Sequence, residues 1–370
     1  MKNFRVEVPE NFNFGYDVVD AWAEEQPDKK ALLWVGKDKE KIDFTFADIK
    51  RESDRAASYF TSLGIEKGDR VMLILKRHYQ FWFAILGLHK LGAIAVPATN
   101  LLQEHDFTYR FNAAGISAIL CTADGDVAHQ VELAEKDSPT LTTKVLVGGS
   151  REGWHNFDEE YLMYRSSFPR TADSPKGDDL MLMFFTSGTT GRSKAVMLAE
   201  RNFFTVMQMH VAMGDHLLDF KHRQLPKDKN DVLSNFAILP LFHLGTFICL
   251  FSWPFKGWAL NLCSDLRNFY RDLGLMHSDS IAVAPVLMES IYKDVKRGRA
   301  DKLNGLWNPC GSSALFDSEM LLGLVENGMY ITQCYGMTET CGDGLVNYAQ
   351  AEPHIRALGK PDGHCEYKLD

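Results

Sequence analysis

The sequence predicts an α/β protein with two packed βαβ-type subdomains and mainly parallel sheets. Short apolar runs such as 71–75 (VMLIL) and 181–185 (MLMFF) are continuous and not alternating, which is typical of strands buried on both faces of a parallel sheet. Amphipathic stretches lie between these runs, and this alternation indicates βαβ units. The length of 370 residues suits two or three packed subdomains.

Along the chain, apolar runs give the expected strands and the stretches between them give the expected helices. The window 81–96 is the most apolar, but it contains His89 and Lys90 and ends at Pro97. It therefore predicts a helix followed by a buried strand, and no membrane span. Strands are expected at 31–35, 71–75, 117–121, 144–148, 181–185, 232–239, 281–284 and 329–333. Helices are expected at 17–25, 46–63, 78–92, 104–114, 126–136, 199–213, 285–297 and 314–327.

Two polar segments indicate where the chain divides. Residues 148–179 are rich in Gly, Ser and Pro, so we expect a seam there, with a first subdomain over 1–178 and a second over 179–340. Residues 219–231 carry seven charged side chains and Pro226, which predicts an exposed loop.

Composition excludes several classes of protein. The 49 acidic residues outnumber the 40 basic ones, and this balance argues against nucleic-acid binding, which needs a basic surface. Seven cysteines, an odd number without a C-x-x-C pair, argue against a disulfide framework and a zinc site. The first residues have no apolar core of signal-peptide length. A reducing, cytoplasmic location is therefore expected.

The segment from Thr186 to Lys194 (TSGTTGRSK) has the composition of a phosphate-binding loop. It holds two Gly, three Thr, two Ser and one Lys between two strand-like runs. Glycines let backbone N–H groups approach an anion, hydroxyls add donors, and Lys194 adds positive charge. An ordinary hairpin turn needs fewer residues. A nucleotide-kinase loop needs G-x-x-x-x-G-K before a helix, whereas this spacing is G-x-x-G-x-x-K before a strand-like run.

This loop resembles the T-S-G-T-T-G-x-P-K signature of the adenylate-forming superfamily. Ser193 stands where that family usually has Pro, and Ala195 where it often has Gly. The resemblance implies that the loop binds ATP. The ATP-binding residues it implies here are Thr186, Ser187, Gly188, Thr189, Thr190, Gly191 and Lys194.

Three further segments follow in the order that the family has them. LPLFHLG (239–245) resembles the family's P-[LM]-[FY]-H segment, which would place His243 at the mouth of the acyl pocket. PCGSSAL (309–315) resembles the segment along the adenine, which implies roles for Gly311, Ser312 and Ser313. Taken alone, a histidine in the first pattern is more often packed in a core, and the second pattern is more often a plain strand-to-helix turn with a serine N-cap.

The third segment, ITQCYGMTET (331–340), resembles the family's Y-G-x-T-E motif. Tyr335 offers an aromatic face for adenine, and Gly336 allows close backbone approach. Thr338 offers a hydroxyl to the α-phosphate, and Glu339 offers a hard oxygen to Mg. The same resemblance implies that Gln333 and Met337 contact the nucleotide. In isolation the motif also fits a strand that ends in a turn.

The resemblance extends to both ends of the chain. Residues 8–34 are similar to the opening of medium-chain and acetyl-type acyl-CoA synthetases, and GKPDG (359–363) to the family's G-[RK]-P-x-P-G turn. Family members continue with an aspartate, a hinge and a small lysine-bearing domain. We therefore expect residues 1–370 to be the large N-terminal portion, with 341–370 beginning a mostly truncated β-barrel subdomain. Weak ATP binding and poor turnover are expected of such a portion.

The resemblance implies an AMP-forming acyl-CoA synthetase with ATP, Mg and CoA as its cofactor and co-substrates. His243, Thr338 and Glu339 would carry the chemistry on a fatty or other hydrophobic acid. The uncharged run after His243 disfavours an amino acid, and so a peptide-synthetase adenylation domain. A non-catalytic nucleotide- or acyl-binding module and a luciferase-like oxidase stay open. The expected partners are small molecules, without nucleic acid or a membrane, and the resemblance is compatible with a homodimer.

Overall fold

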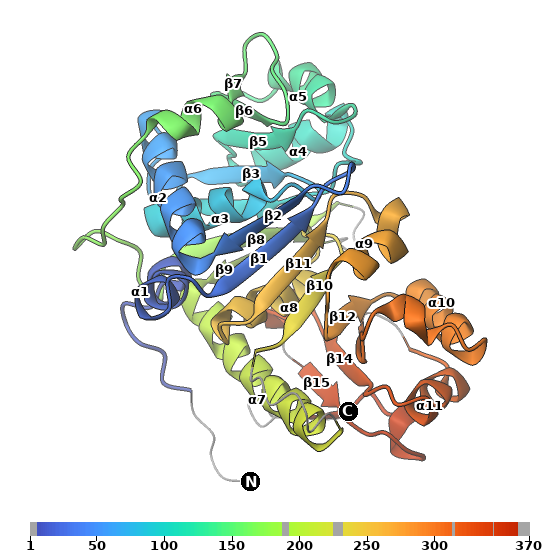
Figure 1. The fold of residues 1–370 in the computed structure, drawn as a ribbon. Helices are drawn as coiled ribbons and strands as arrows, with labels where there is room; N and C mark the ends of the chain where they lie inside the picture. The colour runs from blue at the N-terminus through green and yellow to red at the C-terminus, as the bar shows by residue number, and fades with distance from the viewer. Residues whose placement is uncertain (1–5, 187–191, 225–231, 313–314, 343, 362–370) are drawn as a thin grey trace.

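Two largely parallel β-sheets organise the chain, as Figure 1 shows for the computed structural model. The structure describes residues 6–186, 192–224, 232–312, 315–342 and 344–361. The strand order is β7-β6-β5-β3-β4-β8-β9 in the first sheet and β16-β15-β14-β13-β12-β10-β11-β1-β2 in the second. The predicted α/β class with mainly parallel sheets is confirmed.

The seven-stranded sheet is parallel except at one edge, where β9 pairs antiparallel with β8. Its central strands are continuous apolar runs, so both faces need cover from helices. The strands are β3 (Arg70–Ile74), β4 (Ile94–Pro97), β5 (Ala118–Thr122), β6 (Thr143–Val147), β7 (His155–Asn156), β8 (Leu180–Thr186) and β9 (Lys194–Ala199).

The nine-stranded sheet has a parallel centre and antiparallel edges, formed by β2 at one end and by β15 and β16 at the other. Its strands are β1 (Lys30–Val35), β2 (Lys41–Thr45), β10 (Ser234–Ala237), β11 (Ala259–Cys263), β12 (Ser280–Val283), β13 (Asn308–Ser312), β14 (Thr332–Gly336), β15 (Gly344–Asn347) and β16 (Lys360–Pro361).

Local sequence signals set several helix ends. Thr45 and Asp48 form a reciprocal capping box at the start of α2, and Gly92 ends α3 in the left-handed conformation. The α-helices are α1 (Ala21–Glu25), α2 (Phe46–Ser62), α3 (Gln80–Leu91), α4 (Glu104–Ala114), α5 (Val127–Glu135), α6 (Phe157–Glu160), α7 (Glu200–Gln224), α8 (Leu244–Phe255), α9 (Phe269–Leu275), α10 (Pro285–Lys296) and α11 (Ser318–Glu326). A π-helical turn, η1 (Gly15–Asp20), precedes α1.

An aromatic core joins the two sheets through α8. Phe247 of α8 is fully buried and contacts Phe184 of β8, Phe203 of α7 and Phe251 of its own helix at ring-centroid distances of 4.2–5.8 Å. Burying such rings supplies roughly 1.5–3 kcal/mol each. Helix α8 is thus fixed against both sheets, and so is the segment just before it.

The sheets do not follow the expected boundary near residue 178. Strands β1 and β2 come from the first half of the chain but join the nine-stranded sheet, whereas β8 and β9 lie after the boundary and join the seven-stranded sheet. Likewise, β15 and β16 extend the nine-stranded sheet by pairing with the edge of β14, so the described residues after 340 continue that sheet. Strand pairing between distant segments, which a linear pattern does not encode, decides these memberships.

Some expected elements also differ in extent. Helix α7 continues to Gln224, so residues 219–224 of the expected loop are helical, and Lys221 is buried; residues 225–231 lie outside the described part. Strand β14 begins three residues later than expected, at Thr332, because the apolar residues before it pack in the core without joining the strand. Helix α8 and strand β11 were not expected.

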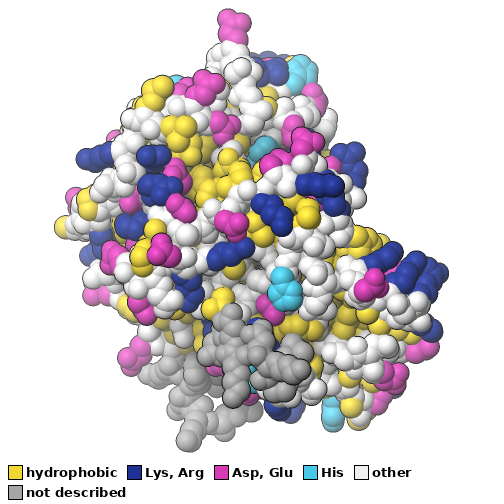
Figure 2. Space-filling view, in the orientation of Figure 1, with side chains coloured by type: hydrophobic (Ala, Val, Ile, Leu, Met, Phe, Trp, Pro, Cys, Tyr) yellow, Lys and Arg dark blue, Asp and Glu magenta, His cyan; other side chains and the backbone are white. Residues whose placement is uncertain are grey.

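The surface of the described residues fits the composition. Acidic and basic side chains are intermixed over the face shown in Figure 2. Within the described ranges, no helix is long and apolar enough to cross a membrane.

Candidate active site

The carboxyl ends of the parallel strands β10, β13 and β14 bring three predicted motifs to one edge of the nine-stranded sheet. The 239–245 segment follows β10, and Gly311 and Ser312 close β13. In the β13–β14 ladder Gly311 pairs with Gln333, and Ser312 pairs with Cys334 just before the Y-G-x-T-E residues. This edge is where ligands bind in open parallel sheets.

A cavity of about 140 Å³ lies at this edge, and two of the three predicted catalytic residues, His243 and Thr338, line it. The structure therefore brings together motifs that lie almost 100 residues apart. Among the described residues, those that line the cavity are His210, His243, Gly245, Ile248, Cys249, Cys334, Tyr335, Gly336, Met337, Thr338, Gly342 and Leu345.

His243 stands directly before α8, which fixes its backbone. Its amide donates to the Pro240 carbonyl at 3.3 Å, and its own carbonyl accepts from the Phe247 amide at 3.0 Å. The ring faces the cavity, and desolvation by the surrounding wall lowers the pKa of His243 below its usual value. The imidazole is therefore neutral at pH 7, so it can donate and accept hydrogen bonds but supplies no fixed positive charge.

Tyr335 and Gly336 end β14, and Met337, Thr338 and Glu339 begin the tight turn that leads to β15. Met337 accepts at its carbonyl from the Gly342 amide at 2.7 Å, and the Thr338 carbonyl accepts from the Cys341 amide at 3.1 Å. A Cβ at Gly336 would collide with the Gly342 carbonyl. We expected Gly336 to allow close approach of the substrate. In the structure the backbone of Gly342 packs against it, and only a residue without a Cβ fits there.

This turn presents its side chains in different directions. Tyr335 is 44% and Met337 50% exposed, so both have surface left for a ligand, while Thr338 is half-buried in the cavity wall. Glu339 is exposed and does not line the cavity. Thr338 and Glu339 therefore face different surroundings although they are adjacent in sequence.

The predicted adenine segment is only partly available to a ligand. Gly311 is buried with the ring of Phe316 against it, so a side chain at this position has no room. The Gln333 amide donates to the Ile355 carbonyl at 2.8 Å, so its donor holds the chain after β15. Ser312 ends β13, and Ser313 lies outside the described residues.

The described ends of the predicted phosphate loop lie on the seven-stranded sheet. Thr186 and Lys194 are cross-strand partners at the base of the β8–β9 hairpin, and Lys194 is exposed. Neither residue lines the 140 Å³ cavity. Residue Ser193 is held by its carbonyl, which accepts from the Tyr109 hydroxyl at 2.8 Å. Ser187, Gly188, Thr189, Thr190 and Gly191 lie outside the described residues.

The sequence analysis missed His210 of α7, which lines the same cavity as His243. A signal was present, because α7 buries residues at helical spacing and thereby places His210 on its apolar face. The buried positions on this face include Phe203, Val206, Met207, His210, Met213 and Leu217.

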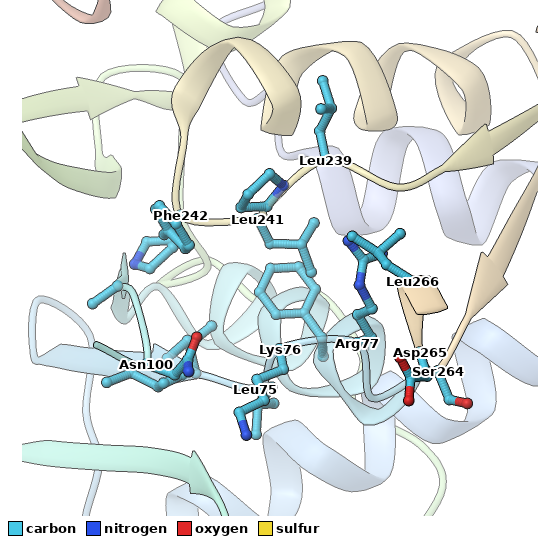
Figure 3. A pocket seen from close by; sticks show the side chains of 16 residues that line it. Leu75, Lys76, Arg77, Asn100, Leu239, Leu241, Phe242, Ser264, Asp265 and Leu266 are labelled. Atoms are coloured by element: carbon cyan, nitrogen blue, oxygen red, sulfur yellow. The ribbon is translucent and has the colours of Figure 1, made fainter. Parts of the chain in front are cut away.

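A second cavity, of about 300 Å³, lies between the carboxyl ends of the two sheets. Residues 75–77, after β3, and residues 97, 98 and 100, at and after the end of β4, form one side. Residues 239–242 and 264–266 form the other, and Figure 3 labels residues from both sides. The segment 239–243 contributes to both cavities. Residues 239–242 line the larger one, and His243 lines the smaller one.

Arg77 ties the two sheets together at this second cavity. Its guanidinium donates to the carbonyls of Ala237, the last residue of β10, and of Ile238, which follows the strand. Burial lowers the pKa of Arg77 from its ordinary value, although a guanidinium stays charged at neutral pH. The contact holds the start of the segment that carries His243.

Comparison with known proteins gives a consistent result. A family model described as AMP-binding enzyme matches residues 19–370. The mitochondrial acyl-coenzyme A synthetases ACSM5 of Rattus norvegicus and ACSM1 of Homo sapiens are 34% and 36% identical over 196 and 195 residues. Each match covers 51% of this chain and 33% of the relative, so the matched region spans about a third of the relatives' length.

Solved structures share the fold. An anthranilate CoA ligase, AuaEII, in complex with anthranoyl-AMP superposes with a TM-score of 0.80 at 20% identity, over 96% of this chain and 65% of that one. The N-terminal domain of FACL13 from Mycobacterium tuberculosis gives a TM-score of 0.74 at 19% identity, over 90% and 78% of the two chains.

Proposed function

We propose that this chain, which belongs to the AMP-binding enzyme family, carries the ATP- and acyl-binding part of an ATP-dependent acyl-CoA ligase. In the first step, a carboxylate oxygen attacks the α-phosphorus of ATP, and pyrophosphate leaves with the electrons of the broken P–O bond. In the second step, the thiol of CoA attacks the acyl carbon, loses its proton, and AMP leaves. The substrate is a hydrophobic carboxylic acid.

The observation that carries this proposal is the common cavity of His243 and Thr338. The Thr338 hydroxyl would donate to an α-phosphate oxygen, and neutral His243 would hydrogen-bond the reacting carboxylate. Both groups reach one cavity from separate elements that packing fixes, which gives the positioning that a two-substrate displacement needs.

The nucleotide would extend from this cavity towards the β8–β9 hairpin. Exposed Tyr335 offers its ring to the adenine, and exposed Lys194 offers its ammonium to the phosphates. Mg²⁺ would be held by Glu339 together with ATP phosphate oxygens, and it would neutralise their charge. A single exposed carboxylate fits that ion, because Mg²⁺ commonly binds one or two carboxylates plus substrate phosphates.

The 300 Å³ cavity is our candidate for the thiol-bearing arm of CoA. It adjoins the segment that ends in His243, and its lining combines apolar residues with Arg77 and Asn100. An extended arm that alternates methylene and amide groups needs this mixture of apolar walls and hydrogen-bonding groups.

We also propose a reducing compartment, the cytoplasm, as the location. The support is that the sequence has seven cysteines, an odd number without a C-x-x-C pair. The curated relatives named above are described as mitochondrial.

A binding experiment tests the proposed function. Isothermal titration of the 370-residue chain with ATP and with a non-hydrolysable acyl-adenylate analogue should show binding of both. Thr338→Val should weaken both by roughly 3- to 10-fold, because it removes one hydrogen bond of about 0.5–1.5 kcal/mol, and Thr338→Ser should restore the affinity. Absence of binding to either ligand contradicts the proposal.

The alternative is a non-catalytic binding module, and two observations distinguish it from a ligase. Pyrophosphate release that depends on both ATP and an added acid supports the ligase. A reading frame of the parent gene that continues past Asp370 into a lysine-bearing domain also supports the ligase, whereas a stop codon there supports the module.

A further inference from the structure

The two described ends of the predicted phosphate loop pack against one helix, α4. At the first end, the guanidinium of Arg110 lies 4.9 Å from the ring centroid of Phe185. At the second, the carbonyl of Ser193 accepts from the Tyr109 hydroxyl at 2.8 Å. The guanidinium of Arg192 lies 5.6 Å from the centroid of the Tyr109 ring. Two consecutive residues of α4 therefore contact both sides of the β8–β9 hairpin.

Helix α4 is a firmly anchored support for these contacts. Its Phe107 and Phe111 side chains are fully buried, and the Asn112 side chain donates to the Asp137 carbonyl at 2.8 Å. Strand β9 is held less firmly, because it is the edge strand of its sheet and pairs with β8 alone among the described strands. The half-buried Tyr109 thus connects a well-packed helix to the start of an edge strand.

The hydrogen bond from Tyr109 holds the backbone from which Lys194 extends. The Ser193 carbonyl and the Lys194 amide belong to one planar peptide unit, so a donor that fixes this oxygen also orients the first residue of β9. Ser193 stands where the family signature has Pro, whose ring restricts the backbone dihedral φ. Serine lacks that restriction, and Tyr109 restrains the same residue from outside the loop.

We propose that Tyr109 is a positioning residue for ATP binding, which acts through the Ser193–Lys194 peptide to direct Lys194 to the β- and γ-phosphates. The inference rests on the proposed function, in which Thr338 takes the α-phosphate and Lys194 lies outside the cavity that Thr338 lines. A side chain whose backbone is already fixed loses less freedom when the ligand binds, so more of its interaction energy appears as affinity.

The test is isothermal titration of the 370-residue chain with ATP in the presence of Mg²⁺. Tyr109→Phe removes the hydroxyl and keeps the ring, so the ATP affinity should fall by roughly 3- to 10-fold, the effect of one hydrogen bond. An acyl sulfamoyl-adenosine, an acyl-adenylate analogue without β- and γ-phosphates, should bind this variant within about twofold of wild type.

A double-mutant cycle separates positioning from a general structural role. In a chain that already carries Lys194→Met, the further change Tyr109→Phe should alter the ATP affinity by less than about twofold, because the tyrosine acts through the lysine. Loss of the full 3- to 10-fold in that chain would mean that Tyr109 does not act through Lys194, and this result overturns the inference.

Tyr59→Phe is the matched control. The Tyr59 hydroxyl donates to Glu160 of α6 at 3.0 Å, so this substitution also removes one tyrosine hydrogen bond, but away from the hairpin. Its ATP affinity should stay within about twofold of wild type. An ATP affinity of Tyr109→Phe equal to that of wild type, or an equal loss in Tyr59→Phe, overturns the inference. If the wild-type chain binds no ATP, the proposed function fails instead.

Discussion

Two groups of polar side chains are enclosed by the fold, but their surroundings differ. One is Lys90 near the end of α3 with its hydrogen-bond partners, and the other lines the 140 Å³ cavity. Lys90 is fully buried, and its ammonium donates to Asp20, Asp54 and Ser53 at 2.6–3.0 Å. His243 and Thr338 instead line a cavity large enough for a ligand. The first group is completed by its own chain, while the second keeps hydrogen-bonding capacity for something else.

This comparison shows that burial of a polar residue does not by itself indicate function. His89 and His210 are both buried histidines on helices, with 1% and 5% exposure. His89 packs against Phe251 inside the core and lines none of the cavities described above, whereas His210 lines the candidate acyl cavity. Substitutions in the first region should therefore change stability, and those in the second should change ligand binding.

The largest effect is expected from Lys90→Met. Removing the ammonium leaves the buried Asp20 and Asp54 with only the partly exposed Lys50, at 3.0 and 3.3 Å, to balance them, so the free energy of unfolding should fall by roughly 3–5 kcal/mol in urea titrations. The control is Lys30→Met, which removes an exposed pair with Asp43 and should change stability by less than about 1 kcal/mol. Equal losses in the two variants would show that α3 is not held by this network.

The second effect is a pH dependence from His89. Burial lowers the pKa of His89 to about 3, and its ring nitrogens have no hydrogen-bond partner among the described residues. In the unfolded chain the ring takes up a proton below about pH 6.5, so the unfolded state binds more protons between these values. Stability from this group is thus present above about pH 6.5 and is lost as the pH falls, by roughly 1.4 kcal/mol per unit.

The measurement compares wild type with His89→Leu in urea titrations from pH 7 to pH 4. The variant should lose less stability on acidification, so the difference between the two chains should shrink or reverse as the pH falls. Parallel pH profiles of the two proteins are the result that would contradict the role given to His89.

The smallest effect on stability, and the sharpest on binding, is expected from Gly336→Ala. The added Cβ would meet the Gly342 carbonyl and push the Thr338 turn away from its place, at a cost of about 1–3 kcal/mol. Affinity for an acyl-adenylate analogue should fall by at least about tenfold, since Thr338 moves with the turn. Gly274→Ala, where a Cβ meets nothing, is the control. Unchanged affinity of Gly336→Ala for the analogue would show that Gly336 does not position Thr338 for binding.

Much of the fold followed from the sequence because strong local patterns carry it. The run 81–96 became α3 followed by β4, as its interruption by His89 and Lys90 and its end at Pro97 indicated. Helix α8 was missed because its apolar residues have no polar face to give a helical period, a consequence of burial on both sides. Strand β11 was hidden by the same continuous burial.

The candidate site divides in the same way. His243 and Thr338 were predicted from short motifs, and the structure places them in one cavity. Gln333 stays a predicted nucleotide contact, and the structure adds that its side-chain amide donates to the Ile355 carbonyl. Which partner a motif side chain contacts depends on the neighbours that the tertiary structure places beside it. A local sequence pattern does not identify those neighbours.

The sequence by itself determined the α/β class, the order of the motifs and the chemical groups they offer, because these depend on residue type and on periods of a few residues. Only the tertiary structure decided that β1 and β2 join the strands after 232, that β8 and β9 join those before 148, and that His210 lines the cavity beside His243. Those outcomes depend on pairing between distant strands and on the rotation of α7 against the core, and long-range packing fixes both.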